Sequence, residues 1–487
     1  MNIILDKSLN APLYKQIKDQ VSDMIYSGTL PEGYVLPSER FLAKSLGINR
    51  TTVVVAYEEL KADHLISSHV GKGTKVIYNC RMKKMTGDSN KPPAWTLLFD
   101  YKNYSNDDFF INNIIELSNN NEIISFAANL PDPDMFPFKE IAEIHQELVD
   151  IAPKQLVNLS NVDGYHPLRE SICELMGKRN INVLAKDVML FSSAQQAIDY
   201  CCRVLTKPND LILVEEPTFY GTLQLFKSAG VNILGVPVDK QGIRTDILKM
   251  ILTRYKPKFL YTIPNFHNPT GISMSLERRY ELMELAQYYQ LPIIEDDAYG
   301  ELSYEETNLP SLKTLDTNGY VIYVGTFSKV LSAGLSVGWM TIPKELRKSF
   351  VYLKQVTGLH INTYSQWIIN RFVEKGLYQE HLALVQKNYA MRRDLMIKHL
   401  DAARELGLQL QKPKGGLNLW CRLPPSINST RLMTKMFERN IIYVPGEICY
   451  PNNYSDISYI RLNYTYPRLE QIKEGTAQLV KAIYELM

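Results

Sequence analysis

Three short polar segments in the second half of the sequence carry residue types that could do covalent chemistry together. Residues 268–271 read Asn-Pro-Thr-Gly, residues 295–300 read Glu-Asp-Asp-Ala-Tyr-Gly, and residues 326–329 read Thr-Phe-Ser-Lys. A lysine can bond an aldehyde as a Schiff base, an acid can keep a pyridine nitrogen protonated, and a hydroxyl or amide can bond a phenolate oxygen. Each segment follows an apolar, strand-like run, and ligands in open α/β sheets lie where strands end. The three segments are therefore predicted to meet in one site.

The elements that must position these segments form an alternating pattern. After about residue 122, apolar runs typical of strands alternate with helical segments, which predicts a mostly parallel sheet covered by helices. The last hundred or so residues predict a smaller α+β subdomain, from about 355 to 487. The clearest strand predictions are 187–193, 210–216, 291–297 and 321–327, and the clearest helices are 194–205 and 221–230.

Over roughly residues 120–487 the sequence resembles the fold-type I aminotransferases, which use pyridoxal 5'-phosphate. The three segments occur in that family's order, and Pro-Asp-Pro-Asp-Met-Phe-Pro at 131–137, Gly-Gly-Leu at 415–417 and Arg-Leu-Asn-Tyr at 461–464 agree with it. The resemblance implies the following roles: Lys329 forms the Schiff base, Asp296 pairs with the pyridinium, Tyr299 and Asn268 bond the phenolate oxygen, Phe219 stacks on the ring, and Arg461 clamps a substrate or effector carboxylate.

The predicted phosphate pocket departs from that family's pattern. An arginine usually stands seven residues after the lysine, where this chain has Ser336, and Ala194 replaces a common serine. Leu159 stands roughly where the partner subunit usually offers a tyrosine. Because each lost charge-assisted bond removes ~1.5–3 kcal/mol, we expect weakened cofactor affinity. The donors that remain are the backbone N–H groups of Ala194 and Gln195 and the side chains of Thr326 and Ser328.

The first 78 residues predict three helices and a hairpin. Apolar residues at 13, 17, 21 and 25 recur at helical spacing, and Gly28 is expected to end that helix. A second helix is expected to start near Ser38 with Phe41, Leu42 and Leu46 on its apolar face, and a third is expected to start after Asn49. Two short strands are predicted around a glycine-rich wing at 70–73.

This module resembles the GntR-type winged helix-turn-helix. The resemblance rests on Leu-Pro-Ser-Glu-Arg at 36–40, Leu-Gly-Ile-Asn-Arg-Thr-Thr-Val at 46–53 and Gly-Lys-Gly-Thr at 71–74. Val54 stands where many members have a second arginine, which narrows the expected base readout. The alternative is a small helical interaction domain, because nine basic residues barely exceed eight acidic ones. The DNA contacts that the resemblance implies are Arg40, Asn49, Arg50, Thr51, Thr52 and Gly71.

Residues 79–108, with clustered basic residues and a proline pair, predict a linker between the module at 1–78 and the larger domain at 109–487. This order is typical of the MocR subfamily of GntR regulators. The resemblance implies a transcription regulator that binds double-stranded operator DNA and senses pyridoxal phosphate, or its aldimine with an amino-acid-type or carboxylate effector, at Lys329. It also implies a head-to-tail homodimer.

Two alternatives stay open at the level of sequence. The retained lysine, aspartate and arginine would allow a working aminotransferase. The missing phosphate ligands in the predicted pocket argue against physiological turnover. A cofactor-free sensor could instead use the pocket for another small ligand.

Composition narrows the remaining possibilities. Hydrophobic residues make up 45% and charged residues 22% of the chain, which is the profile of a globular protein. The six cysteines form no C-x-x-C pair, so neither a metal site nor a disulfide framework is expected. With no signal peptide and no apolar run long enough for a membrane helix, a cytoplasmic location is expected.

Overall fold

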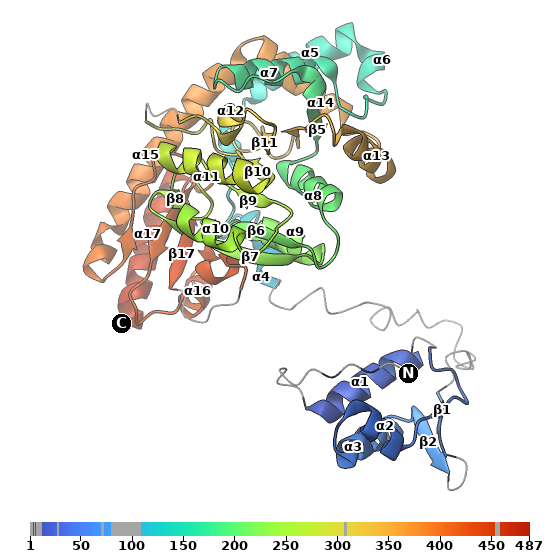
Figure 1. Ribbon diagram of the computed structural model, residues 1–487. Coiled ribbons are helices and arrows are strands. Elements are labelled where there is room, and N and C mark those ends of the chain that lie inside the picture. The colour runs from blue at the N-terminus through green and yellow to red at the C-terminus, as the bar shows by residue number, and fades with distance from the viewer. Residues whose placement is uncertain are drawn as a thin grey trace, which may run out of the picture. The chain divides into compact units, whose positions relative to one another are not determined.

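The computed structural model describes residues 3, 5, 12–26, 29–69, 73–78, 109–305, 309–452 and 458–487. The chain divides into two compact units, residues 1–100 and 101–487, and the two are described separately here (Figure 1). The predicted linker at 79–108 and Gly28 lie outside the described residues. The predicted domain boundaries stay a prediction.

The smaller unit contains the three predicted helices and a small antiparallel sheet. Ile17, Val21 and Ile25 of the first helix are buried, as the spacing predicted. The sheet has the order β1-β3-β2, so a short strand before the second helix joins the predicted hairpin. The elements are α1 (Leu13–Tyr26), β1 (Val35–Leu36), α2 (Glu39–Leu46), α3 (Arg50–Ala62), β2 (Ile66–His69) and β3 (Gly73–Val76).

The prediction for the apolar face of α2 was wrong at one residue. Leu42 and Ala43 are buried, but the Phe41 side chain is 66% exposed. Successive residues of a helix are turned by about 100°, so a core contacted by residues 42 and 43 leaves residue 41 facing outward. Residues 70–72 of the predicted wing lie outside the described residues.

An eight-stranded sheet forms the centre of the larger unit, with the order β5-β12-β11-β10-β9-β6-β7-β8. The strands from β11 to β7 run parallel, whereas β12 and β8 are antiparallel to their neighbours. The mostly parallel sheet is thus confirmed. Its strands are β5 (Val188–Phe191), β6 (Leu211–Glu216), β7 (Asn232–Asp239), β8 (Gly242–Ile243), β9 (Leu260–Thr262), β10 (Ile293–Asp296), β11 (Val321–Thr326) and β12 (Gly338–Thr341).

Alternate residues of the central strands supply two separate cores, one on each face of the sheet. Leu260 and Ile293 pack with residues of α10 and α11, whereas Tyr261 and Ile294 belong to the larger core on the other face. This is the double-sided burial expected of a parallel sheet. The helices up to β12 are α4 (Phe109–Ser118), α5 (Phe138–Ile151), α6 (Pro153–Leu156), α7 (His166–Gly177), α8 (Ala194–Leu205), α9 (Tyr220–Ser228), α10 (Thr245–Leu252), α11 (Leu276–Tyr289) and α12 (Leu312–Leu315).

The C-terminal part of the chain forms a second, smaller sheet with the order β13-β14-β17-β16. A segment that the sequence did not predict joins this region, because β4 (Ile124–Ser125) pairs in parallel with β15 (Ile441–Ile442). The other elements are α13 (Arg347–Thr357), α14 (Thr363–Glu374), α15 (Leu377–Glu405), β13 (Gln409–Leu410), β14 (Asn418–Arg422), α16 (Ser429–Phe437), β16 (Val444–Pro445), β17 (Tyr459–Asn463) and α17 (Leu469–Leu486).

None of the described helices combines the length and the apolar character that crossing a membrane requires. In the same described ranges, no three His, Cys, Asp or Glu side chains gather in a way that could hold a metal ion.

Candidate functional site

The three predicted segments come together because the strands before them are neighbours in the sheet. The strand β10 ends at Asp296 and pairs in parallel with β11, which ends at Thr326, and with β9 on its other side. The carboxyl ends of parallel strands meet at one edge of a sheet. Hydrogen bonds described below link the turn at 268–271 to the residues after β10 and to β17 of the smaller sheet.

Lys329 is partly buried three residues after the end of β11. Its Nζ donates a hydrogen bond to the backbone carbonyl of Asn129 at 3.1 Å. Burial lowers the pKa of Lys329 from 10.5 to about 8; the charge of Arg461 adds to this shift, and the carboxylate of Asp296 opposes it. A lowered pKa leaves more of the neutral amine, which is the form that attacks a carbonyl carbon.

Asp296 lies buried at the end of β10 with only one of its carboxylate oxygens bonded. Its Oδ2 accepts a hydrogen bond from the Tyr261 hydroxyl at 2.7 Å. Its Oδ1 is buried and has no hydrogen-bond partner in the described part of the chain. Buried polar atoms are normally bonded, so this oxygen marks a place where a donor from outside the chain fits. A protonated ring nitrogen has that property.

Burial is also the main reason that the pKa of Asp296 rises from 3.8 to about 6, with the Tyr261 bond opposing the shift. The pKa of Asp296 is higher in the folded protein than in the unfolded chain, so the protonated carboxyl stabilises the folded state. This contribution to the free energy of unfolding is complete below pH 3.8 and is lost as the pH rises through about 6. We therefore expect Asp296→Asn to stabilise the cofactor-free protein at pH 8 by ~1–3 kcal/mol. Urea unfolding at pH 8 and pH 4 measures this.

The expected difference between the two proteins at pH 4 is close to zero, because the wild-type carboxyl is then neutral as well. Equal stability at pH 8 would show that Asp296 has a nearby donor or cation that the isolated chain already supplies. Asp134→Asn is the matched control, because that carboxylate is 68% exposed.

Tyr299, three residues after Asp296, has a buried hydroxyl that accepts two hydrogen bonds. The side-chain amides of Asn268 and Asn129 both donate to it at 3.0 Å. A hydroxyl that accepts two bonds keeps its own proton free to donate elsewhere. The predicted pair of Tyr299 and Asn268 is thus brought together, with the tyrosine as the group able to donate toward a phenolate oxygen.

Asn129 is a residue of this site that the sequence reasoning missed. Besides contacting Tyr299 and Lys329, it accepts a bond from the Asn418 amide of β14 at 2.8 Å. Its backbone has φ +53°, in the left-handed region, which asparagine adopts more readily than most residues. An asparagine before Leu-Pro carries no signal of such a role, because its partners lie far away in the sequence. Tyr261 and Asn418 were missed for the same reason.

Two substitutions separate the backbone role of Asn129 from its side-chain role. Asn129→Gly keeps the left-handed backbone and removes the amide, whereas Asn129→Ala removes the amide and strains the backbone by ~1–2 kcal/mol more. The expected order of stability in urea is therefore wild type, then Asn129→Gly, then Asn129→Ala. Equal stability of the two variants would mean that the backbone at this position relaxes without strain.

The predicted stacking residue, Phe219, is half-buried directly before α9. Its ring lies against Gly221, since a Cβ added at that glycine would be 2.7 Å from Phe219 Cζ. The carbonyl of Gly221 accepts a bond from the Gln195 side chain at 2.7 Å. The starts of α8 and α9 are thereby joined, and Phe219 stays next to the start of α8.

At the predicted phosphate pocket, α8 begins at Ala194 and is capped by Ser193, whose Oγ accepts from the Gln196 N–H at 3.1 Å. Gly338 permits the close approach of β12 to this end, because any Cβ there would lie 2.7 Å from the Ala194 nitrogen. The first N–H groups of a helix lack partners within it and favour anions. Backbone donors at Ala194 and Gln195 are therefore available here.

The side chains around that helix start are already bonded among themselves. Ser336 donates to the carbonyl of Ser192 at 2.7 Å. Thr326 donates to the Ser328 hydroxyl at 3.0 Å, and the Ser328 N–H donates to Thr326 at 3.1 Å. The serine that replaces the expected arginine thus supports the backbone at this edge and adds no positive charge.

Arg461 is fully buried on β17. It donates to the Asn268 side chain at 3.1 Å and to the carbonyl of Ala127 at 2.7 Å, and its guanidinium lies over the Tyr220 ring at 5.5 Å. Its Nε is buried with no partner in the described residues. Arg461 therefore carries an uncompensated buried donor beside Asn268, as a carboxylate-binding arginine would.

In the smaller unit, the turn between α2 and α3 presents the predicted DNA contacts. Asn49 caps α3 by accepting from the Thr51 N–H at 3.1 Å, and Gly47 has φ +63° in the turn before it. Arg50 is 57% exposed and pairs with Glu39 at 3.1 Å. Arg40 and Thr51 are exposed and Thr52 is half-buried, so these side chains are open to a ligand. Gly71 lies outside the described residues.

Known proteins match both units of the chain. The family model for bacterial regulatory proteins of the gntR family matches residues 13–76, and that for aminotransferase class I and II matches residues 121–476. The HTH-type transcriptional regulator YdfD of Bacillus subtilis is 32% identical, covering 99% of this chain and 98% of its own.

Relatives without the smaller unit match as well. Aromatic-amino-acid aminotransferase 1 of Thermococcus litoralis is 36% identical over 77% of this chain and 92% of its own. The structure of the α-aminoadipate aminotransferase LysN of Thermus thermophilus, in complex with N-(5'-phosphopyridoxyl)-L-leucine, superposes with a TM-score of 0.75. It is 31% identical and covers 81% of this chain and 99% of its own. The aminotransferase-like fold of the larger unit is thus confirmed.

Proposed function

Because the chain belongs to the MocR subfamily of GntR-type transcription regulators, with an aminotransferase class I and II domain, we propose that its larger unit binds pyridoxal 5'-phosphate and an amino-acid-type effector and thereby controls operator binding by α2 and α3. The unpartnered Oδ1 of Asp296, in the same site as the low-pKa amine of Lys329, carries the proposal. Such a regulator acts in the cytoplasm, where its DNA lies.

The residues of the site divide the work of holding the cofactor. Pyridoxal phosphate supplies an aldehyde that can bond an amine and a pyridinium ring that withdraws electrons. Lys329 would hold the aldehyde carbon, Asp296 would accept from the ring nitrogen, and Tyr299 would donate to the phenolate oxygen. Phe219 would cover the ring. The backbone N–H groups of Ala194 and Gln195 would hold the phosphate, helped by Thr326 and Ser328.

The effector would meet Arg461. Its unpartnered Nε and its place beside Asn268 suit a carboxylate, and a guanidinium can bind that group with two bonds. Since Ser336 stands where the family's phosphate arginine usually lies, we expect cofactor binding weaker than in relatives that have that arginine. The cofactor concentration would then itself influence occupancy.

The direct test measures DNA affinity together with cofactor binding. Fluorescence anisotropy with labelled duplexes from the region upstream of this protein's own gene would be recorded without ligand, with pyridoxal phosphate, and with pyridoxal phosphate plus each amino acid. We expect binding that depends on sequence and that changes several-fold with one amino compound. If the protein bound all duplexes equally well, the proposed role as an operator-binding regulator would be excluded. If its DNA affinity did not change with any ligand, the proposed role of the larger unit as a ligand sensor would be excluded.

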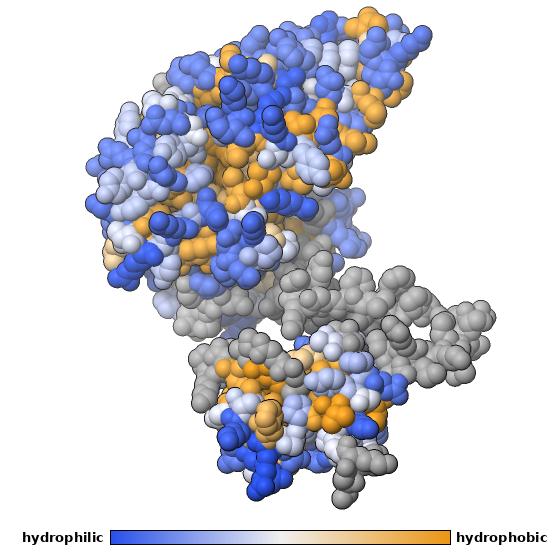
Figure 2. Space-filling view, turned by 45° about the vertical axis from the view of Figure 1, so that its right-hand side comes forward, coloured by the Kyte–Doolittle hydropathy of each residue, from blue (hydrophilic) through white to orange (hydrophobic). Residues whose placement is uncertain are grey.

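We further propose that the larger unit forms the head-to-tail homodimer implied by the family. Large apolar side chains are exposed on it, including Val157 at 84%, Leu159 at 74% and Phe138 at 67%. Figure 2 shows hydrophobic patches open to the surface on one face of this unit. Exposed patches of this kind mark interaction sites. Sedimentation of the full chain tests the dimer, and a monomer at micromolar concentration would exclude it.

A working aminotransferase is the second candidate. The specific observation in its favour is that hydrogen bonds link Arg461 to Lys329 through Asn268, Tyr299 and Asn129. The charge of Asp296 also acts on Lys329. Steady turnover of an amino acid with a 2-oxo acid acceptor at ordinary enzymatic rates would favour this function. A single half-reaction without turnover fits the sensor instead.

A further inference from the structure

A second cavity of the larger unit, with a volume of about 500 Å³, is lined by basic side chains. Its walls come from the turn after α7, the turn between β7 and β8, the loop after β9, the segment after β10 and the connection between β13 and β14. Among the described residues that line it, none is an aspartate or a glutamate. The basic lining residues are Lys178, Arg179, Lys240, Lys412 and Lys414.

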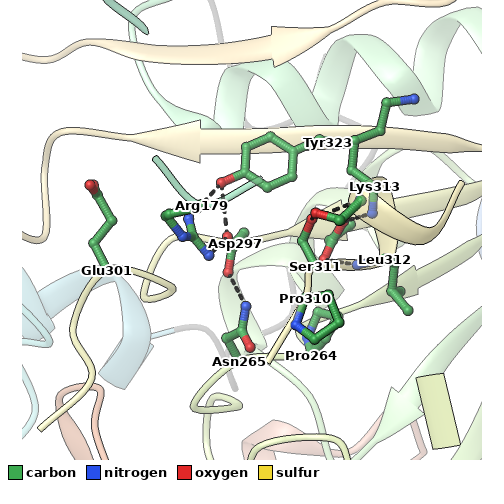
Figure 3. A network of polar contacts seen from close by, with 12 residues as sticks. Arg179, Pro264, Asn265, Asp297, Glu301, Pro310, Ser311, Leu312, Lys313 and Tyr323 are labelled. Atoms are coloured by element: carbon green, nitrogen blue, oxygen red, sulfur yellow. Dashed lines mark hydrogen bonds and ion pairs between the residues drawn. The ribbon is translucent and has the colours of Figure 1, made fainter. Parts of the chain in front are cut away.

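Arg179 is held rigidly at this cavity (Figure 3). Its guanidinium pairs with Asp297 at 2.6 Å and donates to the Tyr323 hydroxyl at 3.0 Å, while Asn265 bonds the other oxygen of Asp297 at 2.7 Å. Its side chain is still 22% exposed, and these contacts use its two terminal nitrogens, Nη1 and Nη2. A Cβ at Gly300 would collide with both Arg179 and Asp297, so the backbone is shaped around this pair.

The lysines around the cavity are only partly neutralised. Lys412 pairs with Asp394 at 2.8 Å, and Lys414 pairs with Glu305 at 3.7 Å. Among the described residues, neither Lys178 nor Lys240 has a carboxylate within ion-pair distance. These two ammonium groups therefore line the same concave surface as Arg179, and such a surface concentrates anions.

We propose that this cavity is a second ligand site, separate from the Lys329 site, which binds a small molecule bearing at least two carboxylate or phosphate groups. Its volume lies within the ~300–1,000 Å³ typical of small-molecule sites. Polar side chains at 180, 265, 270, 273 and 303 supply further hydrogen-bonding groups along its wall.

The position of the cavity would couple its occupancy to the Lys329 site. Asp297 faces Arg179, and the preceding residue, Asp296, belongs to the first site. Thr270 and Gly271 line the cavity directly after the turn that begins with Asn268. On the other wall, residues 411–414 lead into β14, where Asn418 bonds Asn129. A polyanion there would join the two sheets, which goes beyond the proposed function.

Calorimetric titration of the full-length protein tests the proposal, with inorganic pyrophosphate and citrate as the two probes. The variant Lys178→Gln/Lys240→Gln replaces two exposed side chains and should fold normally. We expect its affinity for at least one probe to fall by roughly tenfold or more. The two probes distinguish a phosphate ligand from a carboxylate ligand. Lys227→Gln, an exposed lysine outside the cavity, should bind as the wild type does.

The double variant also separates this site from the cofactor's phosphate pocket, because Lys178 and Lys240 line the second cavity and are not among the residues that would hold the cofactor. Both probes are titrated against the cofactor-free protein, so the second site can be established even if pyridoxal phosphate does not bind. Arg179→Lys, which keeps the charge, should weaken binding less than the double variant does. Unchanged affinity in Lys178→Gln/Lys240→Gln, or no binding of either probe to the wild type, would overturn the proposal.

Discussion

Lys329→Ala is expected to abolish covalent retention of pyridoxal phosphate completely. The Lys329 amine, with its pKa lowered to about 8, is the amine of the site that contacts Asn129 and is influenced by the charges of Asp296 and Arg461. Wild-type protein mixed with the cofactor should gain a visible absorbance band at a longer wavelength than the band of free pyridoxal phosphate. Borohydride reduction should then add to the peptide that contains Lys329 the mass of one cofactor, less the water lost on condensation and plus two hydrogens from the reduction.

The exposed residue Lys207 provides the matched control, and Lys207→Ala should keep the band and the mass shift unchanged. A band that persists in Lys329→Ala would place the covalent chemistry on another lysine. The absence of any band in the wild type would favour the cofactor-free sensor. In that case the affinity of the protein for its operator should still change with some other small ligand.

Arg50→Ala is expected to lower operator affinity by ~1–3 kcal/mol, which corresponds to a loss of roughly 5- to 150-fold. Arg50 starts α3, is 57% exposed and pairs only with Glu39 in the described part of the smaller unit. An exposed ion pair contributes ~1 kcal/mol or less, so Arg50 can exchange Glu39 for a base or a phosphate at small cost. Anisotropy titrations at fixed salt measure the change.

Two further variants show whether the effect belongs to the first turn of α3. Lys61→Ala removes a cation from the last turn of the same helix, where it pairs with Glu58, and should change affinity little. Glu39→Gln releases Arg50 and should strengthen binding slightly. An equal loss in Arg50→Ala and Lys61→Ala would indicate nonspecific electrostatic attraction. A salt slope that falls by about one in Arg50→Ala would indicate a phosphate contact.

The sequence predicted those features that depend on local patterns. The helix spacing in α1, the strand ends at Asp296 and Thr326 and the capping of α3 by Asn49 all follow from neighbouring residues. Phe41 was predicted wrongly because an apolar residue type does not specify which way a short helix faces the core.

Features set by distant contacts could not be predicted. Asn129 meets Tyr299 and Asn418, which lie 170 and 289 residues away along the chain. The bond between the Tyr261 hydroxyl and Asp296 depends on the register between β9 and β10, which the sequence does not specify. The basic cavity draws its lysines from three separate turns, each of which alone resembles an ordinary solvated loop.

The pairing of β4 with β15 has a consequence for how a signal could leave the site. Along the chain, β4 comes after the smaller unit and ends only four residues before Asn129. The backbone carbonyl of Asn129 accepts a hydrogen bond from the Lys329 amine. If that amine were used in a covalent bond, the carbonyl would lose its donor, and the first paired element before Asn129 along the chain, the one exposed to that change, would be β4.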